Sequence, residues 1–113
     1  MTAGPPILAS RDRAEELPTE PNHPTDPLLR HGSMELRWYA PKGHDAQPAH
    51  DRDEIYVVIT GKGWFVSGDR RVAFGPSDAL FVPAHQTHRF EDFTPDLAVW
   101  VILYGPTGGE ARM

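Results

Sequence analysis

Seven short runs of strand-forming residues, each closed by turn residues, occupy the chain from residue 33 onward. β-Branched and aromatic side chains are frequent within the runs, while Gly, Pro, Ser and Asp gather between them. The runs cover residues 34–39, 54–59, 64–66, 70–74, 79–82, 88–91 and 97–104. No helical period is sustained after residue 30. This pattern predicts an all-β domain, built as a small sandwich or barrel.

Length and composition narrow the function classes. A chain of 113 residues is expected to form one domain with one modest core. It has no cysteine, so disulfides and thiolate metal sites are excluded and only nitrogen and oxygen ligands remain. A net charge of -5 disfavours nucleic acid as a partner. No apolar run approaches the roughly 20 residues that cross a bilayer, and no secretory signal is recognised, so we expect a cytoplasmic protein without a membrane partner.

The two ends of the chain differ in composition from the strand-rich part. Residues 1–32 contain six prolines and are predicted to form an extended arm, with one short helical turn within 10–17 capped by Ser10 or Asp12. The arm is either a disordered tail or a segment that packs over its own barrel or over a neighbour's. The strand-rich domain covers residues 33–105, and residues 106–113, rich in glycine, are expected to form a loose tail.

Two histidines and one carboxylate lie on or beside predicted strands at spacings that suit a metal site. His50 and Glu54 are four residues apart, so a regular strand would point both side chains to one face. His88 comes from a distant run that follows Pro83. Two imidazoles and one carboxylate form an open transition-metal site, which leaves coordination positions for substrate and oxygen. The same alternation favours Tyr56, Val58 and Phe90 as pocket walls, with Trp100 as a further candidate.

These segments resemble the two sequence motifs of the cupin superfamily over residues 33–104. The first motif, Gly-x5-His-x-His-x3,4-Glu-x6-Gly, is matched in its second half by Pro48-x-His50-x3-Glu54-x6-Gly61. The second, Gly-x5-Pro-x-Gly-x2-His-x3-Asn, is matched by Ser77-x5-Pro83-x-His85-x2-His88-x3-Asp92. The resemblance implies an all-β, single-domain cupin-type β-barrel (a jelly roll) with a metal held at its mouth.

The chain departs from the cupin motifs at several positions. Pro48 stands where the family has its first histidine, so the resemblance implies three ligands, His50, Glu54 and His88, in place of four. Gln47 is the nearest replacement for the lost ligand, although regular strand alternation would point it away. His85 replaces a turn glycine. His44 and His85 are expected to be exposed to solvent.

Two functions remain open on this evidence. The resemblance implies a metal-dependent enzyme acting on a small organic molecule, and the open ligand set favours a dioxygenase among dioxygenase, isomerase, cyclase and decarboxylase activities. Iron is the favoured metal, while manganese, nickel, zinc and copper also suit the ligands. Gln47 or Arg37 could then orient a polar substrate group. The alternative is a binding or sensing module without turnover. A homodimer with the N-terminal arm packed across the interface is expected in either case, because an exposed sheet edge needs cover.

Overall fold

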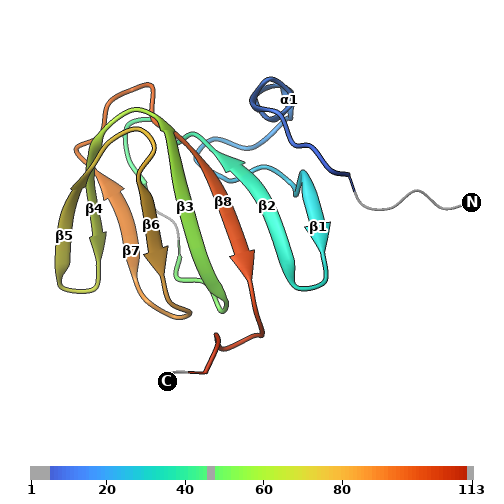
Figure 1. The fold of residues 1–113 in the computed structure, drawn as a ribbon. Helices are drawn as coiled ribbons and strands as arrows, with labels where there is room; N and C mark the ends of the chain where they lie inside the picture. Colours follow the sequence, from blue (N-terminus) through green and yellow to red (C-terminus); the bar gives the residue numbers. More distant parts are fainter. Residues whose placement is uncertain (1–5, 46–47, 112–113) are drawn as a thin grey trace, which may run out of the picture.

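Two antiparallel β-sheets face each other in the structure, a computed structural model that describes residues 6–45 and 48–111 (Figure 1). The larger sheet has the strand order β1-β2-β8-β3-β6. These strands are Leu29–His31 (β1), Met34–Tyr39 (β2), Ala98–Tyr104 (β8), Asp53–Thr60 (β3) and Ala79–Val82 (β6). The smaller sheet has the order β5-β4-β7, formed by Arg70–Phe74, Gly63–Ser67 and His88–Glu91. This architecture confirms the all-β, cupin-type barrel predicted from the sequence.

Each of the seven predicted runs forms a strand within one or two residues of its predicted bounds. The eighth strand, β1, was not predicted. It lies inside the segment assigned to the extended arm and pairs with β2 through Leu29↔Leu36 and His31↔Met34. The large sheet therefore begins at Leu29 and not at residue 33. With only three residues, β1 is too short to show a recognisable alternation in sequence.

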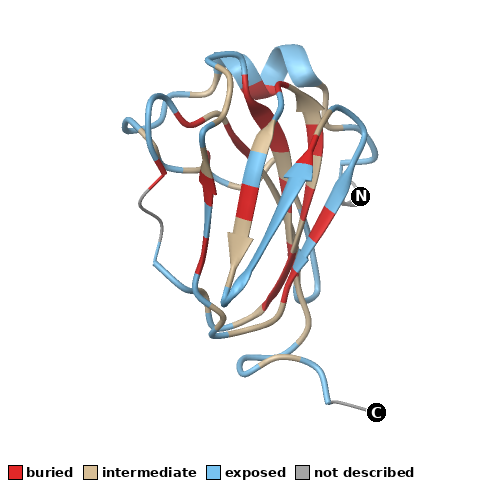
Figure 2. Ribbon diagram, turned by 90° about the vertical axis from the view of Figure 1, so that its left-hand side faces the viewer, coloured by how far each residue is buried: buried red, intermediate tan, exposed pale blue. Residues whose placement is uncertain are grey.

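The hydrophobic core lies between the two sheets. In β3 and β8, alternate residues point inward, and buried positions recur along the strands in Figure 2. The core consists of Tyr39, Tyr56, Val58, Phe65, Phe74, Leu80, Val82, Phe90, Leu97, Val99, Val101 and Leu103. Burial of this apolar surface between the layers is the main driving force for folding.

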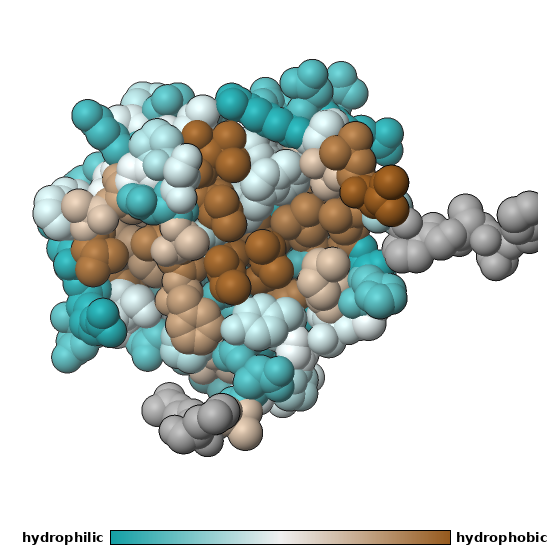
Figure 3. Space-filling view, viewed as in Figure 1, coloured by the Kyte–Doolittle hydropathy of each residue, from teal (hydrophilic) through white to brown (hydrophobic). Residues whose placement is uncertain are grey.

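The outer face of the large sheet, which points away from the small sheet, is also apolar. Register pairs Leu36 with Ile102, Ile55 with Ile102 and Ile55 with Phe81 on this face. Figure 3 shows apolar side chains gathered across it. Helix α1, Arg11–Glu16, covers one corner, where its buried Ala14 packs in a cluster with Trp38 and Ala98. Phe81 remains 55% exposed.

The N-terminal segment is attached to the barrel. Ser10 caps α1 by accepting a hydrogen bond from the Arg13 amide, as one of the two predicted caps. Further along, the Asn22 side chain donates to the carbonyls of Lys42 and His44 and accepts from the Lys42 amide. In the described part of the chain, no helix is long and apolar enough to cross a membrane.

The C-terminal segment, where a loose tail is predicted over residues 106–113, makes backbone contacts with the barrel. The Gly108 amide donates to the Asp51 carbonyl, and the Glu110 amide donates to the Asp53 carboxylate at 2.8 Å. Two glycines of this segment, Gly108 and Gly109, have positive φ angles, a backbone conformation that glycine adopts readily.

Candidate metal centre

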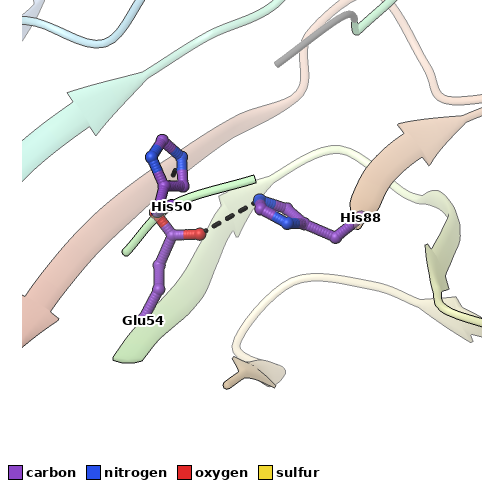
Figure 4. A group of neighbouring side chains, drawn as sticks. All are labelled: His50, Glu54 and His88. Atoms are coloured by element: carbon purple, nitrogen blue, oxygen red, sulfur yellow. Dashed lines mark ion pairs between the residues drawn. The ribbon is translucent and has the colours of Figure 1, made fainter. Parts of the chain in front are cut away.

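His50, Glu54 and His88 converge at one end of the barrel (Figure 4). Glu54 lies near the start of β3, His88 begins β7 in the opposite sheet, and His50 lies in the segment just before β3. The Nε2 atom of His88 is 3.2 Å from Oε1 of Glu54, and Nε2 of His50 is 3.5 Å from Oε2 of the same carboxylate. One ligand atom from each residue lies within 4.8 Å of the others.

The three side chains differ in burial, and this defines how the site is reached. The side chains of Glu54 and His88 are 1% and 0% exposed, whereas that of His50 is 27% exposed. His50 borders a groove of about 510 Å³. The groove is lined by Pro21, Asn22, His23, Pro24, His44, Pro48 and His50. Access to the triad is therefore from the His50 side, between the N-terminal segment and the loop before β3.

Backbone contacts fix the orientation of His88. Its Nδ1 atom is 2.9 Å from the carbonyl oxygen of Gln86. A carbonyl only accepts hydrogen bonds, so Nδ1 carries the proton and donates it, which leaves the Nε2 lone pair facing Glu54 in the neutral ring. This is the arrangement in which a histidine presents Nε2 to a metal while its other nitrogen is held by a second partner.

Burial and the neighbouring acceptor groups shift the pKa of His88 in opposite directions. Burial lowers the pKa of the imidazole, but Glu54, the Gln86 carbonyl and the charge of the buried Asp45 together raise that pKa above its usual value. Asp45 is held by the Tyr39 hydroxyl, which donates to it at 2.6 Å, and by the Phe90 amide at 2.9 Å. The carboxylates of Glu54 and Asp45 therefore favour positive charge at His88.

The donor atoms fit a transition-metal ion. Nε2 of His50 and Oε1 of Glu54 are buried and have no hydrogen-bond partner among the described residues. Buried polar atoms are costly without a partner, and a bound cation would satisfy both. Two donor atoms that each bind the same ion at about 2.1 Å lie about 3.0–3.4 Å from each other when the donor–metal–donor angle is roughly 90–110°. Two nitrogens and one carboxylate suit iron, zinc, copper or nickel, and also manganese.

Aromatic rings form the floor beneath the triad. Tyr56, two residues after Glu54, places its hydroxyl 3.0 Å from Nε2 of His88. The rings of Phe65 and His88 are 6.2 Å apart, and Phe90 lies 5.0 Å from Tyr56. Val58 is buried one inward position further along β3, within the core. Tyr56, Val58 and Phe90 thus all face inward, but only Tyr56 places a polar atom beside the triad.

Two other predicted pocket residues lie elsewhere. Trp100 is on the outer face of the large sheet, where its ring contacts Trp38 edge-on at 4.8 Å, so it cannot line a pocket between the sheets. Arg37 donates to the Glu35 carboxylate at 2.7 Å and to the Thr25 carbonyl at 3.1 Å, and these partners hold its guanidinium. The predicted ligand Gln47 lies outside the described residues.

Several residues around the site were not identified from the sequence. Phe65 is buried while its neighbour Trp64 is exposed, but the sequence of β4 is apolar at both positions and gives no alternation that would reveal this. The Gln86 contact uses a backbone carbonyl, which no side-chain pattern reveals. Asn22 places the proline-rich segment against the groove through contacts 20 and 22 residues away. The only sequence feature that could have pointed to this role is an Asn within a predicted loop. In the structure Asn22 has a φ of 58°.

Two motif positions that lack the family's glycine keep the backbone conformation that glycine favours. Ser77 and His85 have φ angles of 74° and 68°. Both lie in turns that flank β6, and the His85 side chain is exposed, as predicted, like that of His44. Since left-handed φ angles disfavour side chains with a Cβ, these turns keep the motif's backbone geometry at a cost.

Comparisons with known proteins agree with this architecture. The cupin domain family model matches residues 36–104. An uncharacterized protein of Streptomyces coelicolor, SCO3923, is 30% identical over 81 residues, covering 70% of this chain and 77% of the relative. A cupin-2 domain protein from Shewanella frigidimarina has a TM-score of 0.67 at 13% identity, over 88% of this chain and 95% of its own. The plu4264 protein of Photorhabdus luminescens has a TM-score of 0.70 at 16% identity, over 88% of both chains.

The family model covers more than half of this chain and includes His50, Glu54 and His88. The solved structures are below 25% identity and so bear on the fold alone. Together with the two facing sheets and the His50, Glu54 and His88 cluster, these matches establish the family. The chain belongs to the cupin family.

Proposed function

We propose that this protein is a metal-dependent enzyme that acts on a small organic molecule, as a dioxygenase whose metal is held by His50, Glu54 and His88. The observation that carries the proposal concerns two buried atoms, His50 Nε2 and Glu54 Oε1, which converge with His88 Nε2 and have no hydrogen-bond partner in the described part of the chain. Iron is the metal we favour, because a two-histidine, one-carboxylate set with open positions suits oxygen-dependent chemistry.

The residues around the triad would have different roles in such a site. A bound metal would supply open positions at which substrate and dioxygen meet. Glu54 and His88, both fully buried, would hold the ion in a fixed place, and the Gln86 carbonyl keeps Nε2 of His88 facing it. The Phe65 and Phe90 rings keep water from the floor of the site.

Substrate would reach the metal through the groove beside His50. Its walls combine prolines with the imidazoles of His23 and His44, so an apolar molecule that carries a polar group is the class we expect to bind. The groove volume of about 510 Å³ lies in the range of small-molecule sites.

Elemental analysis of purified, tag-free protein tests the metal site. We expect near-stoichiometric metal in the parent and its loss in the His50→Ala/His88→Ala double variant. His44→Ala is the matched control, because His44 lines the same groove but lies outside the triad. Absence of metal from the parent, even after incubation with iron, manganese, nickel, copper and zinc in turn, would reject the proposal.

Nitric oxide tests the open positions without knowledge of the substrate. It binds ferrous iron at vacant coordination positions in place of dioxygen and gives a characteristic electron paramagnetic resonance spectrum. The iron-loaded parent should give this spectrum and the double variant should not. A parent that binds iron but not nitric oxide would lack the vacant position that a dioxygenase needs.

The second candidate is a cupin that binds a small molecule without turnover. Pro48, which stands where the motif has its first histidine and cannot bind a metal, favours it. Once a ligand is found by screening, chelation separates the two functions. A catalytic metal makes turnover sensitive to a chelator and to His88→Ala, whereas a binding module keeps its ligand affinity after either treatment.

A further inference from the structure

The hydroxyl of Tyr56 lies beside His88, one of the three candidate ligands. Tyr56 follows Glu54 by two residues on β3, so both side chains point inward from the same strand. Its hydroxyl oxygen is 3.0 Å from Nε2 of His88, and Nε2 is 3.2 Å from Oε1 of Glu54. Two donors that share a metal at about 2.1 Å and at right angles are about 3.0 Å apart. The distance from the Tyr56 oxygen to Nε2 of His88 is therefore one that two ligands of the same ion can have.

The position of this hydroxyl is fixed by packing. Tyr56 is 0% exposed, and its ring packs edge-on against Phe65 at 5.7 Å and against Phe90 at 5.0 Å. Rings held on two sides have little freedom to rotate away. A donor that is pre-positioned in this way loses little conformational entropy when it binds an ion.

The hydrogen bond between Tyr56 and His88 identifies the space that the ion would share. Because Nδ1 of His88 donates to the Gln86 carbonyl, the neutral ring accepts at Nε2 and the Tyr56 hydroxyl donates to it. The Nε2 lone pair that this hydroxyl contacts is the one that a metal takes. A metal bound to Nε2 therefore arrives beside the phenol oxygen.

We propose that Tyr56 is the fourth metal ligand, in place of the histidine that Pro48 has replaced. This inference rests on the proposed metal centre. On binding, the O–H bond of Tyr56 breaks, its proton passes to solvent, and the phenolate oxygen donates an electron pair to the metal. Together with Glu54, the phenolate gives the ligand set two negative charges. That set favours a hard, oxidised ion such as ferric iron.

Visible absorption of the iron-loaded protein tests the proposal independently of any enzymatic activity. Protein is loaded with ferrous iron without oxygen, oxidised, and its iron content is measured. Phenolate bound to ferric iron gives an intense visible charge-transfer band, and resonance Raman excitation in that band gives tyrosine ring modes. We expect both signals in the parent.

Single-atom variants then assign the band. Tyr56→Phe removes only the hydroxyl oxygen and should abolish the band while raising the iron dissociation constant about tenfold or more. The chain has three tyrosines, so the Tyr39→Phe/Tyr104→Phe double variant leaves Tyr56 alone and should keep the band. This second variant answers the question even where Tyr56→Phe fails to fold.

The outcomes separate this inference from the proposed function. A parent that binds stoichiometric iron without a visible band, or a band that survives in Tyr56→Phe, would overturn Tyr56 as a ligand and leave the three-residue centre intact. A parent that binds no metal would overturn the metal centre and the inference with it.

Discussion

The backbone N–H of His85 donates to the carbonyl oxygen of His50 at 2.6 Å. This bond joins the turn before β7, which leads to His88, to the loop before β3, which carries His50. Two ligands that are 38 residues apart in sequence are thus brought together through the backbone, and not only through their side chains. The residue that makes this bond, His85, has a φ of 68° although it is not glycine.

Replacement of His85 by glycine is expected to stabilise the metal-free protein. Glycine adopts the left-handed φ without the Cβ penalty, which is about 1 kcal/mol, although it costs more conformational entropy on folding. Urea denaturation of the His85→Gly variant should therefore show a free energy of unfolding about 0.5 kcal/mol higher than that of the parent, with unchanged metal content. Ser77→Gly, at a φ of 74°, is the companion variant. A fall in metal affinity in His85→Gly alone would instead assign the exposed imidazole a role in the site.

Gly61, the last residue of the first motif, is expected to tolerate no side chain. Its φ is 91°, and a Cβ would lie 2.5 Å from the Leu97 Cα, which is backbone and cannot rotate away. We expect Gly61→Ala to lower the free energy of unfolding by about 2–4 kcal/mol. Gly32→Ala is the matched control, because Gly32 has a φ of 57° but open space around it. It should cost only about 1 kcal/mol. Equal losses in chemical denaturation would show that the clash with Leu97 is relieved.

Metal removal should lower the thermal stability of the parent. A ligand that binds only the folded state stabilises it by about 2.7 kcal/mol at a hundredfold excess over its dissociation constant. Differential scanning fluorimetry should show a higher melting temperature with added metal and a reversal with chelator. Glu54→Gln should abolish the response, whereas Glu16→Gln, on the exposed helix α1, should retain it. A parent whose melting temperature ignores every metal would contradict a folded-state site.

Glu35 is expected to make stability depend on pH. It accepts hydrogen bonds from Arg37 at 2.7 Å and from Arg52 at 3.0 Å, and Arg52 lies between two of the ligands. The hydrogen bond from Arg37 lowers the pKa of Glu35 most, and the one from Arg52 lowers it further. Burial raises this pKa, but the net result lies below its ordinary value of 4.5. Its contribution is therefore fully present above the unfolded-state value and is lost as pH falls through the lowered pKa.

The Glu35→Gln variant tests this dependence. It should lower the free energy of unfolding by about 1 kcal/mol at neutral pH, and the difference from the parent should shrink at pH values below about 4. Glu20→Gln is the control, since that side chain is 86% exposed. A difference that stays constant down to pH 3 in urea titrations would rule out the charge as the cause.

The outer face of the large sheet is expected to pack against a second copy of this chain, as a homodimer. Its central strands, β3 and β8, are apolar on both faces, a pattern typical of sheets covered on both sides. The paired side chains at the centre of this face are uncharged; they are Leu36, Ile102, Ile55 and Phe81. Two copies related by a twofold axis would therefore meet there without electrostatic repulsion. Figure 3 shows apolar side chains gathered on this face of the molecule.

Light scattering coupled to size-exclusion chromatography tests the dimer. The parent should elute as a dimer, and Ile102→Glu, which places like charges at the centre of the face, should elute as a folded monomer. Val72→Glu is the control, because Val72 is a partly exposed apolar residue of the small sheet. A monomeric parent at micromolar concentration would exclude this mode of pairing.

The sequence alone located seven strands and the three candidate ligands, because both depend on local patterns. A strand repeats every two residues, so Glu54, Tyr56 and Val58 share a face whatever the rest of the chain does. Turn residues end each strand within the same short window. The resemblance to the cupin motifs indicated which two histidines and which glutamate would act as ligands. The structure brings these three candidate ligands together.

Tertiary structure decided what local alternation leaves open. In β8 both faces are apolar, so the pattern could not tell that Val101 points into the core and Trp100 away from it. That choice follows from register with β2 and β3, which is set by residues distant in sequence. The Gln86 carbonyl that orients His88, and the Asn22 contacts that bring the N-terminal segment to the groove, likewise depend on the folded backbone. The sequence determined which groups are available to the site, and long-range pairing of the strands determined which of them face it.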